Sequence, residues 1–201
     1  MKLILSPHPD DAEYSMSATV MKNPETEYVV FLLSDGGDND PTTSFLRREE
    51  AENFWKKIPN VKFISCYSNN TICNMKDWEL VGIVDDLLKK YSFDTIYVPP
   101  LDDNHFEHRK ISECARASLR GKKISLIEYC TPSTRSTWNA NHFVDVSKLY
   151  KRKLQFLKEF KSQLDRPYFQ DYNLSIFHED YFCRLRGVER VEKFKIEFDF
   201  S

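Results

Sequence analysis

The stretch Lys2–Glu13, KLILSPHPDDAE, decides the fold class because it joins an apolar run directly to a polar turn and a helix start. Its first part, Lys2–Ser6, predicts a short buried strand, which Pro7 and Pro9 stop. A helix is expected over Asp11–Met21, beginning at the paired aspartates. A strand followed at once by a helix is the opening of a β-α-β unit, so the stretch predicts an α/β protein.

The same alternation continues through the middle of the chain. Buried strands are expected at Glu27–Leu33, Val61–Cys66, Thr95–Val98 and Lys123–Cys130, and helices at Ser44–Lys57, at Asp77–Tyr91 and from His105 to about Leu119. Thr43 or Ser44 is the expected cap of the first of these helices. Continuous apolar strands separated by helices are typical of a parallel sheet. The predicted fold class is therefore α/β, a Rossmann-like doubly wound, mostly parallel sheet with helices on both faces.

The pattern is looser after Cys130. We expect a short strand at Val144–Val146, a helix capped by Ser147 that reaches about Leu164, and a further helix over Asp171–Arg186. Glu192–Phe200 alternates apolar and charged residues, which predicts a closing strand with one buried face. Since no Gly/Ser/Pro-rich linker divides the chain, residues 1–201 are predicted to form a single domain.

Composition is that of an ordinary globular protein. Hydrophobic residues make up 41% and charged residues 30%, and the 29 basic and 31 acidic residues leave a formal charge of -2. No positive field indicates nucleic-acid binding, and no apolar run has the length of a bilayer span. The five cysteines are widely spaced without a CxxC pair, which favours reduced thiols. We expect a cytoplasmic protein with no integral membrane segment, for which a homo-oligomer is compatible with the sequence.

Two acidic, histidine-bearing segments follow predicted strands. Residues 8–11, HPDD, come directly after Lys2–Ser6, and residues 105–108, HFEH, come shortly after Thr95–Val98. Ligands of open α/β sheets bind beyond the carboxyl ends of the strands, so both segments are expected at the same edge of the sheet. The two histidines of the second segment are three residues apart and share a face if a helix begins there.

Imidazole nitrogens and carboxylate oxygens gathered in this way predict a zinc site. A catalytic zinc ion takes three protein ligands and keeps one open position, and His8, Asp11 and His108 supply such a set. Spacing by itself does not choose between Asp10 and Asp11, because adjacent carboxylates cannot easily both bind one ion. The groups then left for proton transfer are Asp10, His105, Glu107 and Glu13.

The chain resembles the PIG-L/LmbE-like zinc N-deacetylases, which remove acetyl groups from N-acetylglucosamine-type sugars and related conjugates. The resemblance rests on residues 8–13, HPDDAE, which match the family's HPDD-x-E signature, and on residues 105–109, HFEHR, which stand where the family has H-x-D-H-R. Weaker similarities cover the T-D-G-G loop, the R-x-x-E helix, the late helix ending in Ser-Gln and the closing A-E-x-F strand, at residues 34–37, 47–51, 160–163 and 192–194.

This resemblance implies a metal-dependent N-deacetylase acting on a small amino sugar or a glycoconjugate that carries one. It implies that His8, Asp11 and His108 bind Zn2+, and Fe2+ is compatible with the same ligands. Asp10 would be the base that activates water. His105 would polarise the amide carbonyl, stabilise the oxyanion or protonate the leaving amine.

Two features depart from the family pattern. Glu107 stands where the family has Asp between the two histidines. If this carboxylate sets the protonation state of His105, the extra methylene alters its reach and preserves its charge. Residues 15–18, SMSA, replace a glycine-rich stretch, so the first helix is expected to sit slightly differently.

Arg47 and Asp35 are candidate substrate contacts. Arg47 can grip a sugar hydroxyl or a phosphate with several donors, or it can form a salt bridge with Glu50 or Asp35. Asp35 either orients its loop or contacts the substrate. Two other functions stay open: a zinc amidase acting on another amide conjugate, and a non-catalytic carbohydrate-binding member of the same fold. Phosphoester hydrolysis is disfavoured because a two-metal site would need more carboxylates.

Overall fold

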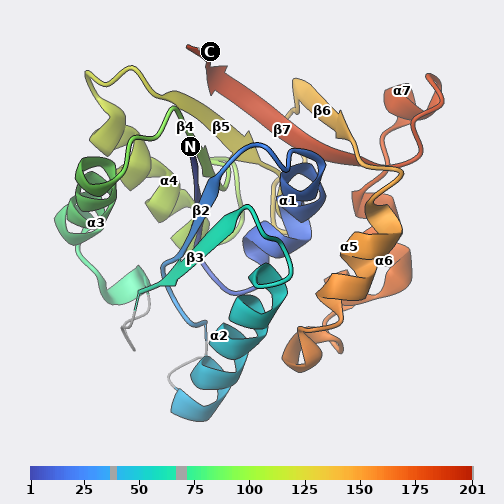
Figure 1. The fold of residues 1–201 in the computed structure, drawn as a ribbon, viewed down its shortest axis with the longest axis horizontal. Coiled ribbons are helices and arrows are strands. Elements are labelled where there is room, and N and C mark those ends of the chain that lie inside the picture. The colour runs from blue at the N-terminus through green and yellow to red at the C-terminus, as the bar shows by residue number, and fades with distance from the viewer. Residues whose placement is uncertain (37–39, 67–71, 201) are drawn as a thin grey trace.

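The computed structural model describes residues 1–36, 40–66 and 72–200. Within them a seven-stranded sheet has the order β3-β2-β1-β4-β5-β7-β6 (Figure 1). The strands are β1 (Lys2–Ser6), β2 (Tyr28–Leu32), β3 (Val61–Ser65), β4 (Thr95–Val98), β5 (Ser125–Tyr129), β6 (His142–Asp145) and β7 (Val191–Phe198).

Helices connect most of these strands. The α-helices are α1 (Asp11–Lys22), α2 (Pro41–Trp55), α3 (Asp77–Lys90), α4 (Phe106–Leu119), α5 (Tyr150–Leu157), α6 (Asp171–Phe177) and α7 (Tyr181–Arg184). Short 3-10 turns are η1 (Ile72–Asn74), η2 (Lys161–Gln163) and η3 (Pro167–Phe169). No helix in these parts of the chain combines the length and apolarity needed to cross a bilayer.

The direction of the strands confirms the predicted fold class. Strands β1 to β5 are parallel to one another, whereas β7 runs antiparallel to both β5 and β6. The chain leaves β1 toward β2 and β3 on one side and returns to β4 and β5 on the other. The strand order therefore switches between β1 and β4, whose register pairs Lys2 with Thr95 and Ile4 with Tyr97. The loops after these two strands emerge side by side, at the place where open α/β sheets bind ligands.

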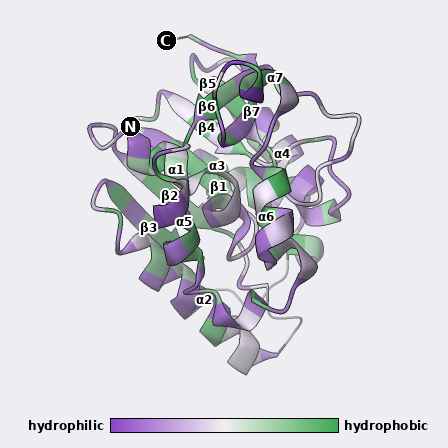
Figure 2. Cartoon of the chain, turned by 90° about the vertical axis from the view of Figure 1, so that its right-hand side faces the viewer, coloured by the Kyte–Doolittle hydropathy of each residue, from purple (hydrophilic) through white to green (hydrophobic). Residues whose placement is uncertain are grey.

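Helices cover both faces of the sheet, as predicted. Alternate residues of β1 point to opposite faces: Ile4 packs with residues of α1, α2 and α5, while Leu3 and Leu5 pack with residues of α3 and α4. Figure 1 shows these two groups of helices on either side of the strands. In Figure 2, α2 carries both hydrophobic and hydrophilic residues, and its buried residues all lie in its second half, at Glu50, Ala51, Phe54 and Trp55. Each fully buried aliphatic side chain contributes about 1.5–3 kcal/mol, so both layers hold the sheet.

Helix α2 begins earlier than predicted. Its cap is Asp40, whose carboxylate accepts hydrogen bonds from the backbone N–H groups of Thr42 (3.2 Å) and Thr43 (3.1 Å). Pro41 occupies the first helical position, where its missing N–H is not needed. The prediction that Thr43 or Ser44 caps this helix is therefore wrong.

Both long helices predicted after Cys130 are shorter in the structure. The helix predicted to run from Ser147 to about Leu164 is only α5, and the Ser147 hydroxyl donates to Asp145 (2.7 Å) instead of capping it. The predicted helix Asp171–Arg186 breaks into α6 and α7, because Asp180 starts a new helix by accepting from the Cys183 N–H (3.0 Å).

Strand β7 is only partly buried on its apolar face. Phe194 is 1% exposed, whereas Phe198 is 38% exposed and Phe200, beyond the strand, is 48% exposed, so the predicted buried face covers only the first part of the strand. Helix α1 meets β7 near the start of the strand, where Glu192 accepts hydrogen bonds from the N–H groups of Ala18 (3.0 Å) and Thr19 (2.6 Å). The later residues therefore lie beyond this contact.

A fully buried polar cluster lies behind this contact. Lys153 of α5 donates to Glu192 (2.5 Å) and contacts Nε2 of His178 (2.7 Å), and all three side chains are 0% exposed. His178 Nδ1 lies 2.8 Å from the Leu174 carbonyl oxygen. His178 is therefore neutral, with Nδ1 donating to the carbonyl and Nε2 accepting from the ammonium group.

This cluster predicts that the protein loses stability in acid. Burial, together with the charges of Lys153 and Lys193, holds the pKa of His178 well below 6.5, while in the unfolded chain it is about 6.5. The unfolded state then binds more protons below pH 6.5, so the stabilising contribution is complete above this pH and is lost as the pH falls. We expect a slope of up to about 1.4 kcal/mol per pH unit from this group. Urea unfolding of wild type and His178→Gln between pH 7 and 5 measures this slope. If the free energy of unfolding changes with pH equally in both proteins, the prediction is wrong.

Candidate functional site

A pocket of about 590 Å³ lies at the carboxyl edge of the parallel strands. Its walls come from the loops after β1, β2, β4 and β5 and from the turns η2 and η3. The predicted residues that line it are His8, Asp10, Asp11, Arg47, His105 and His108. The structure therefore brings together the two histidine-bearing segments, as their places after β1 and β4 predict.

Asp11 lies between the two buried histidines. Its Oδ2 is 3.1 Å from His8 Nδ1 and 3.2 Å from His108 Nε2. Ligand bonds of 2.0–2.2 Å in tetrahedral geometry place neighbouring donor atoms about 3.3 Å apart. His108 Nε2 is buried and makes no hydrogen bond with any described residue, which is unusual for a buried nitrogen. The two measured distances therefore fit Asp11 as the neighbour of each histidine in the ligand set of one divalent metal ion.

The charges around His108 also favour a cation. Burial alone would lower the pKa of His108, but the carboxylates of Asp11 and Asp103 raise it to about 10. The site thus favours positive charge and holds a proton when no metal is bound, and a divalent ion would displace that proton on binding.

His105 is a second neighbour of this centre. One ring nitrogen from each of His8, His105 and His108 lies within 4.8 Å of the others, and the His105 ring stacks on His108 at a centroid distance of 4.6 Å. The His105 side chain is exposed to the pocket, whereas the other two are buried. Its nitrogens are therefore available to a bound molecule.

Each buried histidine has a second carboxylate behind it. His8 Nε2 contacts the carboxylate of Glu107, and His108 Nδ1 lies 3.2 Å from Asp103 Oδ2. Such carboxylate–histidine pairs are usual behind metal-binding imidazoles. The hydrogen bonds of Glu107 go to His8 and to the Cys73 N–H, so the residue meets His8 rather than the His105 side chain considered from the sequence.

Asp10 lies beside this centre in a strained backbone conformation. Its φ of 99° is in the left-handed region, which costs a non-glycine residue about 1–3 kcal/mol. Glu13 holds it there by accepting from the Asp10 N–H (3.1 Å), and Trp55 Nε1 fixes Glu13 at 2.6 Å. Burial and the Asp11 carboxylate raise the pKa of Asp10 to about 7, against the lowering effect of Arg47.

Arg47 joins two loops around Asp10. It donates to the carbonyl oxygens of Gly36 and Pro9 (2.9 Å for the latter) and lies 3.4 Å from Asp10 Oδ2. Gly36 has a φ of 61°, and a side chain there would collide with the Arg47 guanidinium. The loop after β2 therefore needs glycine at this position to keep its contact with Arg47.

The salt bridges considered for Arg47 are not formed. Asp35 lies 3.3 Å from Arg48, and the Glu50 carboxylate accepts from the Ser162 N–H (2.9 Å) and hydroxyl (2.6 Å). Asp35 is buried and does not line the pocket, although Ser34 and Gly36 do.

Among the lining residues that were not identified from the sequence, Gln163, Arg166 and Tyr168 come from the last part of the chain. The Tyr168 hydroxyl donates to Asp10 Oδ2 at 3.2 Å. These residues lie in or beside η2 and η3, whose irregular backbone gives no periodic signal. The Ser-Gln similarity at residues 162–163 was the one sign that this region reaches the site.

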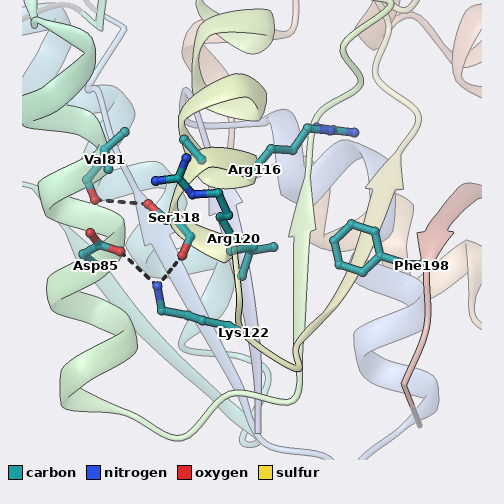
Figure 3. Close-up of a pocket in the computed structure, with 9 residues that line it drawn as sticks. Val81, Asp85, Arg116, Ser118, Arg120, Lys122 and Phe198 are labelled. Atoms are coloured by element: carbon teal, nitrogen blue, oxygen red, sulfur yellow. Dashed lines mark hydrogen bonds and ion pairs between the residues drawn. The ribbon is translucent and has the colours of Figure 1, made fainter.

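A second hollow, of about 690 Å³, lies at the opposite edge of the sheet, before β5 (Figure 3). Three of its charged groups are engaged: Lys122 lies 3.5 Å from Asp85 and also contacts the Ser118 carbonyl oxygen, and Arg116 lies 2.7 Å from Glu128. None of the predicted site residues lines it.

Comparison with known proteins identifies the family and agrees with the fold. Residues 3–119, which include both histidine-bearing segments, match the model of the family PIG-L, described as GlcNAc-PI de-N-acetylase. The chain belongs to the PIG-L family. None of the curated proteins matches it in sequence.

Solved structures share the PIG-L fold of this chain at low identity. The conserved protein TT1542 from Thermus thermophilus has a TM-score of 0.78 at 16% identity, covering 100% of this chain and 95% of that one. GalB, the 4-carboxy-2-hydroxymuconate hydratase from Pseudomonas putida, has a TM-score of 0.77 at 15% identity, and the match covers 100% of this chain and 98% of that one. N,N'-diacetylchitobiose deacetylase from Pyrococcus horikoshii has a TM-score of 0.71 at 18% identity, and the match covers 97% of this chain and 82% of that one. These similarities establish the fold.

Proposed function

We propose that this chain is a zinc-dependent amidohydrolase that removes the acetyl group from an N-acetylglucosamine-type sugar or glycoconjugate. The observation that carries the proposal is the meeting of His8 Nδ1, Asp11 Oδ2 and His108 Nε2 beside the buried carboxylate of Asp10. Membership of the PIG-L family and the deacetylases among the similar structures support the same reaction. Residues 1–201 would act as one domain, and the five free cysteines favour a reducing, cytoplasmic compartment.

His8, Asp11 and His108 would hold the metal, with Zn2+ as the proposed ion and Fe2+ compatible with the same donors. A bound divalent ion supplies Lewis acidity, which polarises the amide carbonyl and makes a water molecule more acidic. Asp10 is not needed as a ligand, because Asp11 already lies between both histidines.

Asp10 is proposed as the proton carrier. A carboxylate whose pKa is about 7 accepts a proton from the attacking water and can return it to the leaving amine near neutral pH. Tyr168 and Arg47 both contact Asp10 Oδ2, so they orient its carboxylate toward the pocket. Arg47 therefore acts on the substrate mainly through Asp10 and through the loop at Gly36.

His105 is proposed as the hydrogen-bond donor to the carbonyl oxygen. Burial and the neighbouring His8 and His108 lower the pKa of His105, so a neutral imidazole with one N–H faces the pocket at neutral pH. A donor held beside the reacting carbonyl stabilises the negative charge that develops on its oxygen. Asp35 contributes to substrate binding only through its loop, because its carboxylate pairs with Arg48.

Acetate release and metal content measured on the same preparation test the function. We expect near one zinc per chain, with equal amounts of acetate and new primary amine released from at least one N-acetylglucosamine conjugate. Dialysis against a chelator is expected to abolish release, and added Zn2+ or Fe2+ to restore it, because the Lewis acid is removed and returned. Bound metal without acetate from any conjugate would point to another amide, or to addition of water to a double bond as in the hydratase GalB.

A further inference from the structure

The two buried histidines present opposite ring nitrogens to Asp11. His8 turns Nδ1 toward Asp11 and Nε2 toward Glu107. His108 turns Nε2 toward Asp11 and Nδ1 toward Asp103. A histidine that binds a metal is neutral, with one N–H and one lone pair. With the lone pair turned toward Asp11 and the metal, the N–H is left facing the outer carboxylate.

Several hydrogen bonds fix the Asp103 carboxylate where it faces His108. It is 0% exposed, and its Oδ2 accepts from the Thr131 hydroxyl (2.6 Å) besides facing His108. Its Oδ1 accepts from the Ser133 hydroxyl (2.7 Å) and from the backbone N–H of His105 (2.7 Å). Since these donors come from the loops after β4 and β5, the carboxylate cannot turn away from the His108 ring without losing several hydrogen bonds.

Glu107 bridges two elements that are distant in sequence. From the first turn of α4 its Oε2 reaches His8 Nε2, and its Oε1 accepts from the Cys73 N–H (2.7 Å) in η1. An aspartate at this position would withdraw the carboxylate by one carbon–carbon bond, about 1.5 Å. It could then keep one of these contacts but not both. The glutamate that departs from the family motif is therefore fitted to the His8 ring.

We propose that Asp103 and Glu107 are positioning residues that hold His108 and His8 in opposite tautomers, so that the metal is bound through Nε2 of His108 and Nδ1 of His8. The inference depends on the proposed metal site but not on the reaction performed there. Loss of such outer carboxylates typically weakens metal binding by about 10–100-fold. Through them the loop at Ser133 and the turn at Cys73 both contribute to metal affinity.

Zinc affinity of the purified chain tests this without any substrate. Titration with Zn2+ against a competing chelator is expected to give a Kd about 10–100-fold higher for Asp103→Asn and for Glu107→Gln, and a smaller increase for Glu107→Asp. Glu113→Gln, which changes an exposed carboxylate on the same helix, is the matched control and should bind as the wild type does. Thermal unfolding of the metal-free variants shows whether each one is folded. If Asp103→Asn does not fold, the zinc affinity of Glu107→Gln still tests the inference.

Nitrogen NMR of protein labelled with ¹⁵N-histidine tests the tautomers directly. In the zinc-loaded wild type we expect one bound histidine with its N–H at Nε2 and one with its N–H at Nδ1. Two bound histidines of the same type, or unchanged zinc affinity in folded Asp103→Asn and Glu107→Gln, would overturn the inference. If these variants bind zinc more weakly but the wild type releases no acetate, the inference is supported and the proposed reaction is wrong. A wild type that binds no zinc would overturn both.

Discussion

Asp10→Asn is expected to lower kcat for acetate release by about 10²–10⁴-fold, because an amide cannot take the proton from the attacking water. The change should not disturb folding, since asparagine tolerates the left-handed backbone that Asp10 adopts with a φ of 99°. Metal content should also stay near the wild-type value, since Asp11 and not Asp10 lies between the two histidines. The measurement is kcat on the best conjugate, with zinc per chain determined on the same sample.

Tyr168→Phe gives the comparison for this variant. It removes the 3.2 Å hydrogen bond to Asp10 and leaves the proton carrier in place, so we expect a smaller loss of kcat than in Asp10→Asn. If Asp10→Asn binds zinc and keeps wild-type kcat, Asp10 is not the base, and the proton must go to another group such as His105.

Lys153→Met is expected to lower the free energy of unfolding by about 3–5 kcal/mol, the usual result of removing one partner of a buried ion pair. The Glu192 carboxylate would keep its hydrogen bonds from Ala18 and Thr19 but would lose the opposite charge at 2.5 Å. For a chain of this size, a change of this order corresponds to a fall in Tm of roughly 6–20 °C. Urea and thermal unfolding at neutral pH measure it.

Lys151→Met is the matched control, because it makes the same change at an exposed position of α5. We expect it to alter the free energy of unfolding by no more than about 0.5 kcal/mol. Equal effects of the two substitutions would mean that the buried cluster contributes nothing specific. The pair of variants thus separates the ion pair from the general effect of replacing lysine in this helix.

The sequence was enough to predict the meeting of the two motif segments. Residues 8–11 and 105–108 follow strands that a doubly wound sheet places next to each other, and β1 and β4 are indeed neighbours. This part depends only on strand patterns and on the common direction of parallel strands. The same logic explains why the helices on both faces were predicted correctly.

Contacts made by irregular segments could not be predicted in this way. Asp103 stood in an acidic loop without a distinguishing pattern, and its role depends on Thr131 and Ser133, which reach it from the loop after β5. Tyr168 reaches Asp10 across 158 positions of sequence from the turn η3. Neither a periodic pattern nor a spacing rule reports such long-range side-chain contacts.

Helix ends after Cys130 were misjudged for a local reason. Asp180 interrupts an otherwise helical composition by capping a new helix, and Ser147 binds Asp145 instead of the start of α5. Aspartate and serine serve equally well in turns and at helix starts, so composition alone does not decide between the two uses.

The position of β7 between β5 and the edge strand β6 has a consequence for the order in which the sheet is completed. Strand β6 pairs with β7 alone among the described strands, and β7 is made some fifty positions later, as the pairing of His142 with Phe194 shows. During synthesis residues 142–145 therefore stay without a sheet partner until residues 191–198 have left the ribosome. The edge of the sheet is then completed in one late step, which also delivers Glu192 to the middle of α1. A nascent chain stopped before Val191 would display the open edge of β5, and an unpaired strand edge of this kind exposes an unfinished chain to aggregation.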